Sequence, residues 1–293
     1  MSIPGYSEAQ YRVIASSEKK RFEDALTKEV WTADGISGSG EGLLAELEKD
    51  VRDFMEELKV VSYIAGDQGV VLTDTEEKAM AGAAEEYYNS LSQSDIEAMG
   101  ITHEEVAELF REYCAAQKFA GGLAHQDDLE VSDSEAKVIH VLLAATENRD
   151  AAVRLREMAE AEGADFGSLA KELGIAVREM SPGRGQAFDE DSRKLEEAEF
   201  SLASGQVSEV LDIGGVSYVV LCVSDYDEEA TRERKDRISD ARVESAFRRI
   251  YEAYADRVKV ASDAGTGADS GLLGADYAGK ADFFSVYNKY KLQ

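Results

Sequence analysis

Proline and cysteine are both scarce in this chain of 293 residues, which contains only two of each. Because proline interrupts helices and sheets, a chain with so little of it can form long continuous helices. The two cysteines, Cys114 and Cys222, form neither a disulfide framework nor a zinc motif. An exported protein can also lack disulfides, so the cysteine content leaves the cellular compartment open.

The chain also lacks an excess of basic charge, long apolar runs and the motifs of nucleotide or metal enzymes. The chain has 32 Lys and Arg against 60 Asp and Glu, a net charge of −28. Phosphate binding needs a basic surface, so nucleic acid is excluded as an expected partner. No apolar run approaches the roughly 18 residues of a membrane span, and the first residues lack the apolar region of a signal peptide. No phosphate loop, Rossmann fingerprint, zinc motif or serine elbow occurs, so we expect no cofactor and no metal site.

The first 125 residues are predicted to be entirely helical. Their apolar side chains recur at spacings of three, four and seven residues, as on one face of a helix. Two of the helices begin at capping boxes, in which Thr73 and Thr102 are each followed three residues later by a glutamate. The predicted helices cover residues 7–30, 42–65, 73–92 and 102–120.

The pattern changes at about residue 136, where short β-branched runs alternate with helical segments. Two glycines, Gly214 and Gly215, separate the last two runs and predict a β-hairpin. We therefore expect a small α+β block. Its predicted strands are residues 136–143, 175–180, 208–211 and 216–223, and its predicted helices lie near residues 149–162, from 165 onward and at 194–200.

A late helix over residues 228–257 and a short segment at 258–261 follow this block. Residues 41–130 hold 22 acidic and 6 basic side chains, a net charge of 6 − 22 = −16. Residues 231–260 hold 9 basic and 6 acidic side chains, a net charge of 9 − 6 = +3. We expect the late helix to pair electrostatically with the early ones, which makes the α+β block an insertion in one helical domain built from both ends.

The last thirty residues combine a linker-like composition with aromatic side chains. Residues 262–275 are rich in Gly, Ala, Ser and Asp, as in linkers. The rings that follow belong to Tyr277, Phe283, Phe284, Tyr287 and Tyr290. Two interpretations stay open, in which the rings pack on the helical domain or occupy a peptide groove on this molecule or a neighbour.

Several short segments in the α+β block occur in the order found in a known family. They are Val138–Leu143, Ala164–Ala170, Gly183-Arg-Gly185, Phe200–Val210 and Gly215–Val220. Over residues 136–226 the chain resembles the parvulin (PpiC, rotamase) family of peptidyl-prolyl cis-trans isomerases. The N-terminal helices, including Gly69–Glu77, resemble the chaperone region of PrsA- and SurA-like foldases.

This resemblance implies an α+β fold in which a mainly helical chaperone domain, built from N- and C-terminal segments, carries an inserted parvulin-like domain with a small antiparallel sheet. The expected parts are an N-terminal helical chaperone region (1–130), the parvulin-like domain (136–226), a helix and short strand that rejoin the helical domain (227–261), and the linker with its aromatic tail (262–293).

The family's activity is rotation about the X–Pro peptide bond, whose barrier of about 18–20 kcal/mol comes from amide resonance. Such a site needs an apolar proline pocket and polar groups near the carbonyl, and no cofactor. By resemblance, His140 occupies the position of the first family histidine, and Tyr218 that of the second, or Ser217 after a slip of one residue. The cysteine or aspartate that the family usually carries in its site has no counterpart in this sequence.

The pocket residues implied by the resemblance are Leu195, Phe200, Phe188 and Met180, with Ala187 as an alternative to Phe188. Each polar candidate also has a structural interpretation. His140 can be a core histidine bonded to a neighbour across the sheet, Tyr218 a packed strand aromatic, and Met180 a core residue. A Tyr hydroxyl donates a hydrogen bond as histidine does, so we expect Tyr218 to face His140.

The resemblance therefore predicts an extracytoplasmic foldase that binds unfolded exported polypeptides and catalyses X–Pro isomerisation weakly. The alternative is a holdase, with a degenerate parvulin-like domain that binds clients without turnover. A structural surface protein is a third hypothesis. The family is usually found outside the cytoplasmic membrane, often on a lipid anchor. The sequence leaves clients, any leader or anchor, and the choice between monomer and dimer open.

Overall fold

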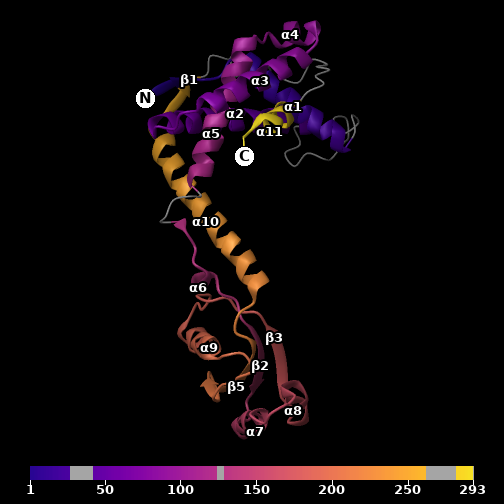
Figure 1. The fold of residues 1–293 in the computed structure, drawn as a ribbon, viewed down its shortest axis with the longest axis vertical. Helices are drawn as coiled ribbons and strands as arrows, with labels where there is room; N and C mark the ends of the chain where they lie inside the picture. The colour runs from indigo at the N-terminus through magenta and orange to yellow at the C-terminus, as the bar shows by residue number, and fades with distance from the viewer. Residues whose placement is uncertain (27–41, 124–128, 262–281, 293) are drawn as a thin grey trace. The chain divides into compact units, whose positions relative to one another are not determined.

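The chain folds into two compact units in the computed structural model, which describes residues 1–26, 42–123, 129–261 and 282–292 (Figure 1). One unit comprises residues 1–123 and 245–293, and we call it the helical unit. The other comprises residues 124–244, and we call it the α+β unit. Helices together with a small antiparallel four-stranded sheet confirm the predicted α+β fold class.

The helical unit is formed from segments at both ends of the chain. Helices α2 and α3 both pack against α5, and α11 packs against α3 and α1. The largest buried side chains of the core include Tyr6, Tyr87, Phe110 and Phe283. The elements are β1 (Ser2–Pro4), α1 (Glu8–Leu26), α2 (Leu43–Asp67), α3 (Asp74–Ser90), α4 (Gln93–Met99), α5 (His103–Leu123), the last part of α10 (Glu228–Ala255), β6 (Lys259–Ala261) and α11 (Phe283–Tyr290).

Capping interactions set the starts of three of these helices. Thr73 and Glu76 form the predicted reciprocal box at α3, and Thr102 and Glu105 form the same pair of bonds at α5. Helix α4 is absent from the sequence-based prediction. Its capping box pairs Ser92 with an aspartate, Asp95, instead of the Glu or Gln of the usual signature.

The first and last strands of the helical unit pair in parallel, with Ser2 opposite Lys259 and Pro4 opposite Ala261. Gly5 follows directly, and a Cβ atom there would lie 2.7 Å from the carbonyl oxygen of Ala261, so only glycine fits. Strand β1 was not predicted, because a three-residue strand containing proline shows no periodicity. The pairing joins segments more than 250 residues apart.

The α+β unit contains one sheet with the strand order β3-β2-β5-β4, and every neighbouring pair is antiparallel. Gly214 and Gly215 form the predicted hairpin turn with positive φ angles of 59° and 83°. The elements are α6 (Asp133–Ala136), β2 (His140–Thr146), α7 (Arg149–Ala159), α8 (Phe166–Glu172), β3 (Ala176–Met180), α9 (Glu190–Ser201), β4 (Leu211–Ile213), β5 (Val216–Ser224) and the first part of α10.

Two apolar clusters cover the two faces of this sheet. One joins Ala144 and Val219 to Leu155 of α7 and Phe166 of α8. The other, which we call the α9 cluster, consists of Ile139, Val141, Leu143 and Val220 together with Leu195, Phe200, Leu202 and Tyr218. The unit thus has a core on each face of its sheet, each with its own helices.

The α+β unit extends beyond the predicted 136–226 at its C-terminal end. The first part of α10 belongs to it, because Thr231 and Arg234 hydrogen-bond backbone groups of Val138 and Glu135. The predicted strand at 136–143 begins only at His140, since Ser132 caps the short helix α6 just before it.

The expected electrostatic pairing of the late helix differs from the observed contacts. Lys235 and Arg242 form ion pairs with Asp133 and Glu135, at α6 in the α+β unit. In the helical unit, the Tyr254 hydroxyl of α10 donates to the carboxylate of Asp67, and α10 also makes aromatic contacts. They are Phe247 with Phe119 and Tyr254 with Tyr63.

The rings of the tail pack on the helical unit, as the first of the two interpretations expects. Phe283 stacks on Phe110 at 4.2 Å between ring centroids, and Tyr287 contacts Tyr113 edge-to-face. Tyr277 and the linker-like residues 262–275 lie outside the described residues. No helix in the described ranges is both long and apolar enough to cross a bilayer.

Candidate functional site

Three of the predicted site residues lie together on one face of the sheet in the α+β unit. Leu195 and Phe200 come from α9 and Tyr218 from β5, and all three are partly buried in the α9 cluster. Helix α9 is fixed at its start by a capping box between Asp189 and Ser192. Leu195, Phe200 and Tyr218 therefore belong to one apolar cluster, and the substrate-binding and catalytic roles that the resemblance gives them stay predictions.

The turn before α9 is bonded to that helix through Glu196. Its carboxylate oxygens accept hydrogen bonds from the backbone N–H groups of Gly185, Gln186 and Ala187, with N–O distances of 2.7, 3.0 and 2.8 Å. Arg184, in the same turn, lies over the ring of Phe200 at 5.0 Å. Thus the Gly183-Arg-Gly185 segment forms a fixed border for the α9 cluster.

Glu199 is a buried acid beside this cluster that sequence reasoning missed. Its side chain is 3% exposed, and its Oε1 atom has no hydrogen-bond partner among the described residues. Burial, reinforced by the nearby Glu196 carboxylate, raises the pKa of Glu199 to about 7. The available signal was spacing, since Glu199 follows Leu195 by four residues and so shares its helix face.

His140 does not face Tyr218, and that expectation is wrong. The strand register pairs Tyr218 with Ala145, five residues along β2 from His140. At about 3.3 Å per residue, the two positions lie roughly 16 Å apart along the strand. A bulge between His140 and Val141 also shifts the register there.

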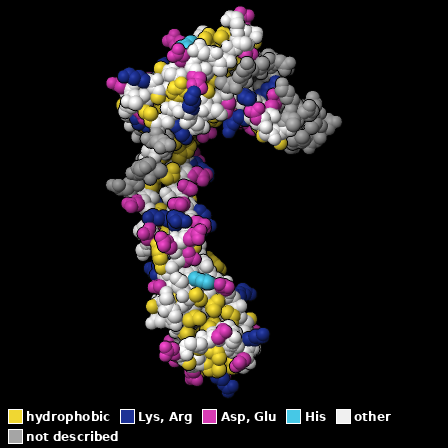
Figure 2. Space-filling model, turned by 45° about the vertical axis from the view of Figure 1, so that its right-hand side comes forward, with side chains coloured by type: hydrophobic (Ala, Val, Ile, Leu, Met, Phe, Trp, Pro, Cys, Tyr) yellow, Lys and Arg dark blue, Asp and Glu magenta, His cyan; other side chains and the backbone are white. Residues whose placement is uncertain are grey.

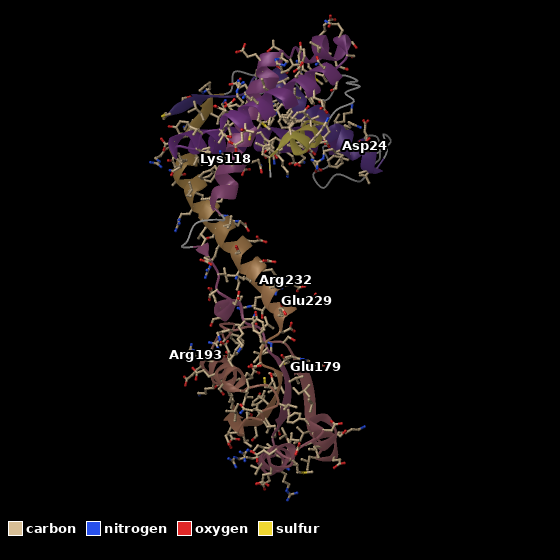
Figure 3. All side chains as sticks on the ribbon, in the orientation of Figure 1. Asp24, Lys118, Glu179, Arg193, Glu229 and Arg232 are labelled. Carbon is tan, nitrogen blue, oxygen red and sulfur yellow. The ribbon has the colours of Figure 1, made fainter. Side chains whose placement is uncertain are left out.

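His140 instead meets an acidic side chain of β3. Its Nε2 atom lies 2.8 Å from Oε1 of Glu179, and the two side chains are 29% and 69% exposed. Figure 3 labels Glu179 on β3. His140 therefore bonds to a neighbour across the sheet, as the structural interpretation expects, but at a partly exposed position and not in the core.

Phe188 and Met180 lie outside the α9 cluster. Phe188 is 89% exposed, just before the cap of α9. Met180 is 38% exposed and pairs in register with Val141 at the end of β3. Ser217, the alternative to Tyr218, is buried and donates to Asp212 at 2.6 Å. None of these residues therefore adds a polar group beside Tyr218.

The chemistry of the α9 cluster is that of an apolar surface with one phenol. Tyr218 can donate a hydrogen bond to a carbonyl, and Glu199 can hold a proton near neutral pH. Figure 2 shows hydrophobic side chains gathered on this unit among charged ones. The cluster therefore lacks the paired polar groups that the resemblance implied.

A second candidate site lies in the helical unit, where a cavity of about 480 Å³ opens between α1, α2, α5 and α11. The rings of Phe54 and Phe284 meet edge-to-face in it, with centroids 6.0 Å apart. Charged side chains, including Glu18, Arg21 and Asp50, share its lining. We call this cavity the apolar groove. Its apolar lining consists of Ile14, Phe22, Leu47, Val51, Phe54, Tyr113 and Phe284.

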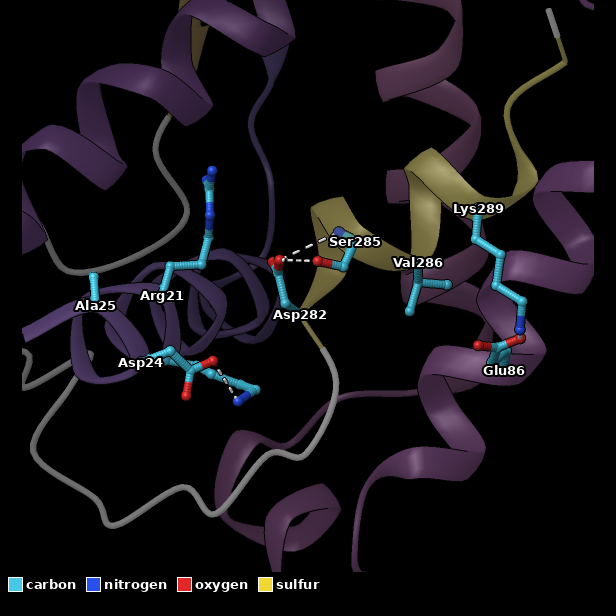
Figure 4. Close-up of a pocket in the computed structure, with 9 residues that line it drawn as sticks. Arg21, Asp24, Ala25, Glu86, Asp282, Ser285, Val286 and Lys289 are labelled. Atoms are coloured by element: carbon cyan, nitrogen blue, oxygen red, sulfur yellow. Dashed lines mark hydrogen bonds and ion pairs between the residues drawn. The ribbon is translucent and has the colours of Figure 1, made fainter. Parts of the chain in front are cut away.

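A more polar cavity of about 720 Å³ lies on another side of α11 (Figure 4). Asp282 caps α11 and accepts from the Ser285 hydroxyl at 2.6 Å, and Lys289 pairs with Glu86 of α3. Lys20 and Asp24 of α1 pair on the opposite wall at 2.8 Å. Among the described residues, no group of three His, Cys, Asp or Glu side chains is placed to hold a metal ion.

Comparison with known proteins yields similarity to solved structures alone, since no family model and no curated protein matches this chain. A PrsA peptidylprolyl isomerase from Bacillus cereus is 16% identical over 88% of this chain and 95% of its own, with a TM-score of 0.34. The foldase PrsA from Streptococcus pneumoniae is 17% identical over 79% and 96%, with a TM-score of 0.27. A structure of SurA-like chaperones from Campylobacter jejuni is 13% identical over 71% and 84%, with a TM-score of 0.23.

Proposed function

We propose that this protein is a chaperone of the foldase type that binds unfolded polypeptide segments in the apolar groove of its helical unit. The observation that carries the proposal is the groove itself, which exposes rings of Phe54 and Phe284 beside charged side chains. Unfolded chains present apolar side chains next to polar backbone, and a groove of this composition matches both. The resemblance of the N-terminal helices, including residues 69–77, to the chaperone region of foldases supports the same conclusion, as does the resemblance of residues 136–226 to parvulins.

Client binding without isomerase turnover is the form of this function that the geometry favours. Stabilising a twisted amide requires an apolar pocket and polar groups converging on one carbonyl. Tyr218 lies at the α9 cluster, whereas His140 lies about five residues away along the sheet and bonds to Glu179. In this proposal the α9 cluster is a clamp for apolar segments.

Suppression of aggregation tests the binding function. Phe54 and Phe22 are partly buried lining residues, so replacing both with serine removes apolar surface from the groove with limited damage to the core. We expect this variant to require at least fivefold more protein to suppress aggregation of a reduced, aggregating client. Phe188→Ser is the matched control, since Phe188 is an exposed phenylalanine outside the groove. Equal activity of all three proteins would overturn the proposal.

A protease-coupled assay on a prolyl tetrapeptide tests the second point. We expect no acceleration above the uncatalysed rate with the unmodified protein. Acceleration that falls on Tyr218→Phe or His140→Ala would restore the weak isomerase that the resemblance predicted. Acceleration unchanged by either variant would place catalysis at other side chains.

The proposed location is outside the cytoplasmic membrane, in keeping with the foldase resemblance. The encoding gene's upstream codons and fractionation of the producing cells test this location. Recovery of the protein in the cytoplasmic fraction alone would contradict it.

A further inference from the structure

Helix α11 occupies its place in the helical unit in the manner of a bound peptide. It has eight residues, too few to be stable in isolation, so contacts with other helices must hold it. It follows β6 only after 21 residues, 262–282, whose composition is dominated by Gly, Ala, Ser and Asp. Its own residues and those of its neighbours show how it is bound.

The aromatic side of α11 is inserted between α3 and α5. Phe283 is completely buried, stacks on Phe110 and meets Tyr87 edge-to-face. Tyr287 is buried at Tyr113, and burial together with the adjacent Cys114 raises the pKa of its hydroxyl. Phe283 and Tyr287 therefore anchor α11 against α3 and α5.

Polar contacts hold both ends of α11. The backbone N–H of Phe283 donates to Ser17 Oγ at 2.9 Å, and Asp282 caps the first turn. At the other end, Lys289 and Tyr290 both bond to Glu86. Gly82 of α3 allows the close approach, since a Cβ there would lie 2.9 Å from the Tyr290 ring.

Helix α11 nevertheless does not fill the space around it. The apolar groove uses Phe284 and Asn288 in its lining, and the polar cavity of about 720 Å³ uses Ser285, Val286 and Lys289. A third cavity, of about 330 Å³, uses Tyr287 and Asn288 beside Cys114. Cavities thus adjoin α11 on several sides, as expected for a site that accepts bulkier helices than the one it holds.

We propose that α1, α3 and α5 form a helix-binding site, that α11 is its resident occupant, and that an aromatic amphipathic helix of a client polypeptide takes its place. This inference rests on the proposed client binding and adds a second mode of it, in which the client helix takes the place of α11 and of the Phe284 ring that α11 contributes to the apolar groove. The occupant presents aromatic residues in the Phe-Phe-x-x-Tyr-x-x-Tyr spacing of α11, an acidic or hydroxyl cap at its start, and a basic residue toward Glu86. Bound in cis, α11 limits access to the site.

The degree to which α11 weakens client binding follows from its covalent connection to the site. A covalently linked occupant acts at an effective concentration on the order of 1 mM. If the isolated occupant binds with a Kd of about 10 μM, the tethered copy weakens binding of a competitor roughly 100-fold, by the ratio of these two values. Cutting the connection should therefore strengthen binding of an added helix.

The test starts from the complete, folded chain, in which a protease recognition sequence replaces residues 265–270. After cleavage and gel filtration, we expect the C-terminal fragment to separate from the rest. A fluorescent peptide of residues 281–292 should then bind the cleaved protein at least tenfold more tightly than the uncut protein. The control peptide carries Phe283→Ala and Tyr287→Ala and should bind at least tenfold more weakly than the natural peptide.

The client part of the inference is tested with a designed helical peptide that has the α11 aromatic spacing in an unrelated host sequence. It should displace the fluorescent peptide from the cleaved protein. Failure to displace, with the natural peptide still competing, would show a site specific for its own tail and overturn the client assignment. Dimers that exchange labelled tails between copies would assign the site to a second copy of this chain.

A fragment that stays bound after cleavage and does not exchange with added peptide would make α11 a fixed structural element and overturn the proposal. This result is separate from failure of the proposed function. If the intact chain suppresses aggregation and cleavage changes nothing, the chaperone function stands and the α11 inference fails. If the peptide binds the cleaved protein but neither the intact nor the cleaved chain suppresses aggregation, the helix-binding site stands and the chaperone function fails.

Discussion

The two units of this protein use their buried side chains in different ways. In the helical unit, rings from segments far apart in sequence converge, as Phe110 and Phe283 do at 4.2 Å. In the α+β unit, mainly aliphatic clusters cover both sheet faces, and one buried acid, Glu199, lacks a hydrogen-bond partner at Oε1 among the described residues. We therefore expect the stability of the helical unit to depend on its far C-terminal segment, and the stability of the α+β unit to vary with the protonation of Glu199.

The largest expected effect is on the aromatic core of the helical unit. Phe110→Ala removes the ring that stacks on Phe283 and contacts Tyr87, and Phe110 is completely buried. Truncation of a buried phenylalanine to alanine lowers the free energy of unfolding by about 3–5 kcal/mol. Hydrogen exchange read by mass spectrometry should show faster exchange in α3, α5 and α11.

The control for this variant is Phe188→Ala, because Phe188 is 89% exposed. It should change the free energy of unfolding by less than about 0.5 kcal/mol. If Phe110→Ala accelerated exchange equally in β2 and β5, the two units would not be separate in stability and the comparison would break.

The second effect is the dependence of the α+β unit on pH. Glu199 has a folded pKa of about 7, above the roughly 4.3 of an unfolded glutamate. A raised folded pKa means that its stabilising contribution is complete below about pH 4.3 and is lost as the pH rises through 7. At 1.36 kcal/mol per pKa unit, the loss in the free energy of unfolding reaches up to about 4 kcal/mol by pH 8.

Glu199→Gln removes this titration, since glutamine stays neutral. We expect the variant to be more stable than the unmodified chain at pH 8 and to lack its decline between pH 5 and 8. Urea unfolding at each pH, with hydrogen exchange in β2 and β5, measures the effect. The matched control is Glu197→Gln, two positions away and exposed on the same helix. An identical decline in the Glu199 and Glu197 variants would remove Glu199 as the cause.

The success of sequence reasoning differs between local features and contacts that are distant in sequence. Local signals determine helix starts and tight turns, so the boxes at Thr73 and Thr102 and the Gly214-Gly215 turn were predictable. Strand β1 and the pairing of β1 with β6 depend on contacts across the whole chain, which local periodicity does not contain.

The candidate site was predictable in composition but not in geometry. Leu195, Phe200 and Tyr218 share a surface, as the resemblance implied, because motif order preserves which strands and helices meet. The distance of His140 from Tyr218 depends on strand register and on a bulge, neither of which a motif specifies. Burial of Glu199 is likewise a tertiary effect, which no composition of a charged helix reveals.

A third, smaller effect concerns the free energy that a single helix cap contributes to the helical unit. Thr73→Ala removes the hydroxyl that accepts the N–H of Glu76 at 3.3 Å at the start of α3. Loss of an N-cap costs about 1 kcal/mol. We expect this decrease in the helical unit, measured by urea unfolding, and Thr73→Ser should retain most of the stability. A cost above about 3 kcal/mol would show that the box also supports the Lys118–Glu76 ion pair.

The smallest expected effect concerns His140, the residue to which the resemblance gave the largest role. Its contact with Glu179 is an exposed pair, and such pairs contribute about 0–1 kcal/mol. His140→Ala should therefore leave both unfolding and aggregation suppression within error, and Glu179→Gln should behave the same. A loss of client binding in His140→Ala that Glu179→Gln does not share would mean that the imidazole itself contacts clients. The binding surface would then include the β2–β3 side of the sheet as well as the α9 cluster, and the α+β unit would bind clients through a polar edge where the helical unit uses aromatic rings.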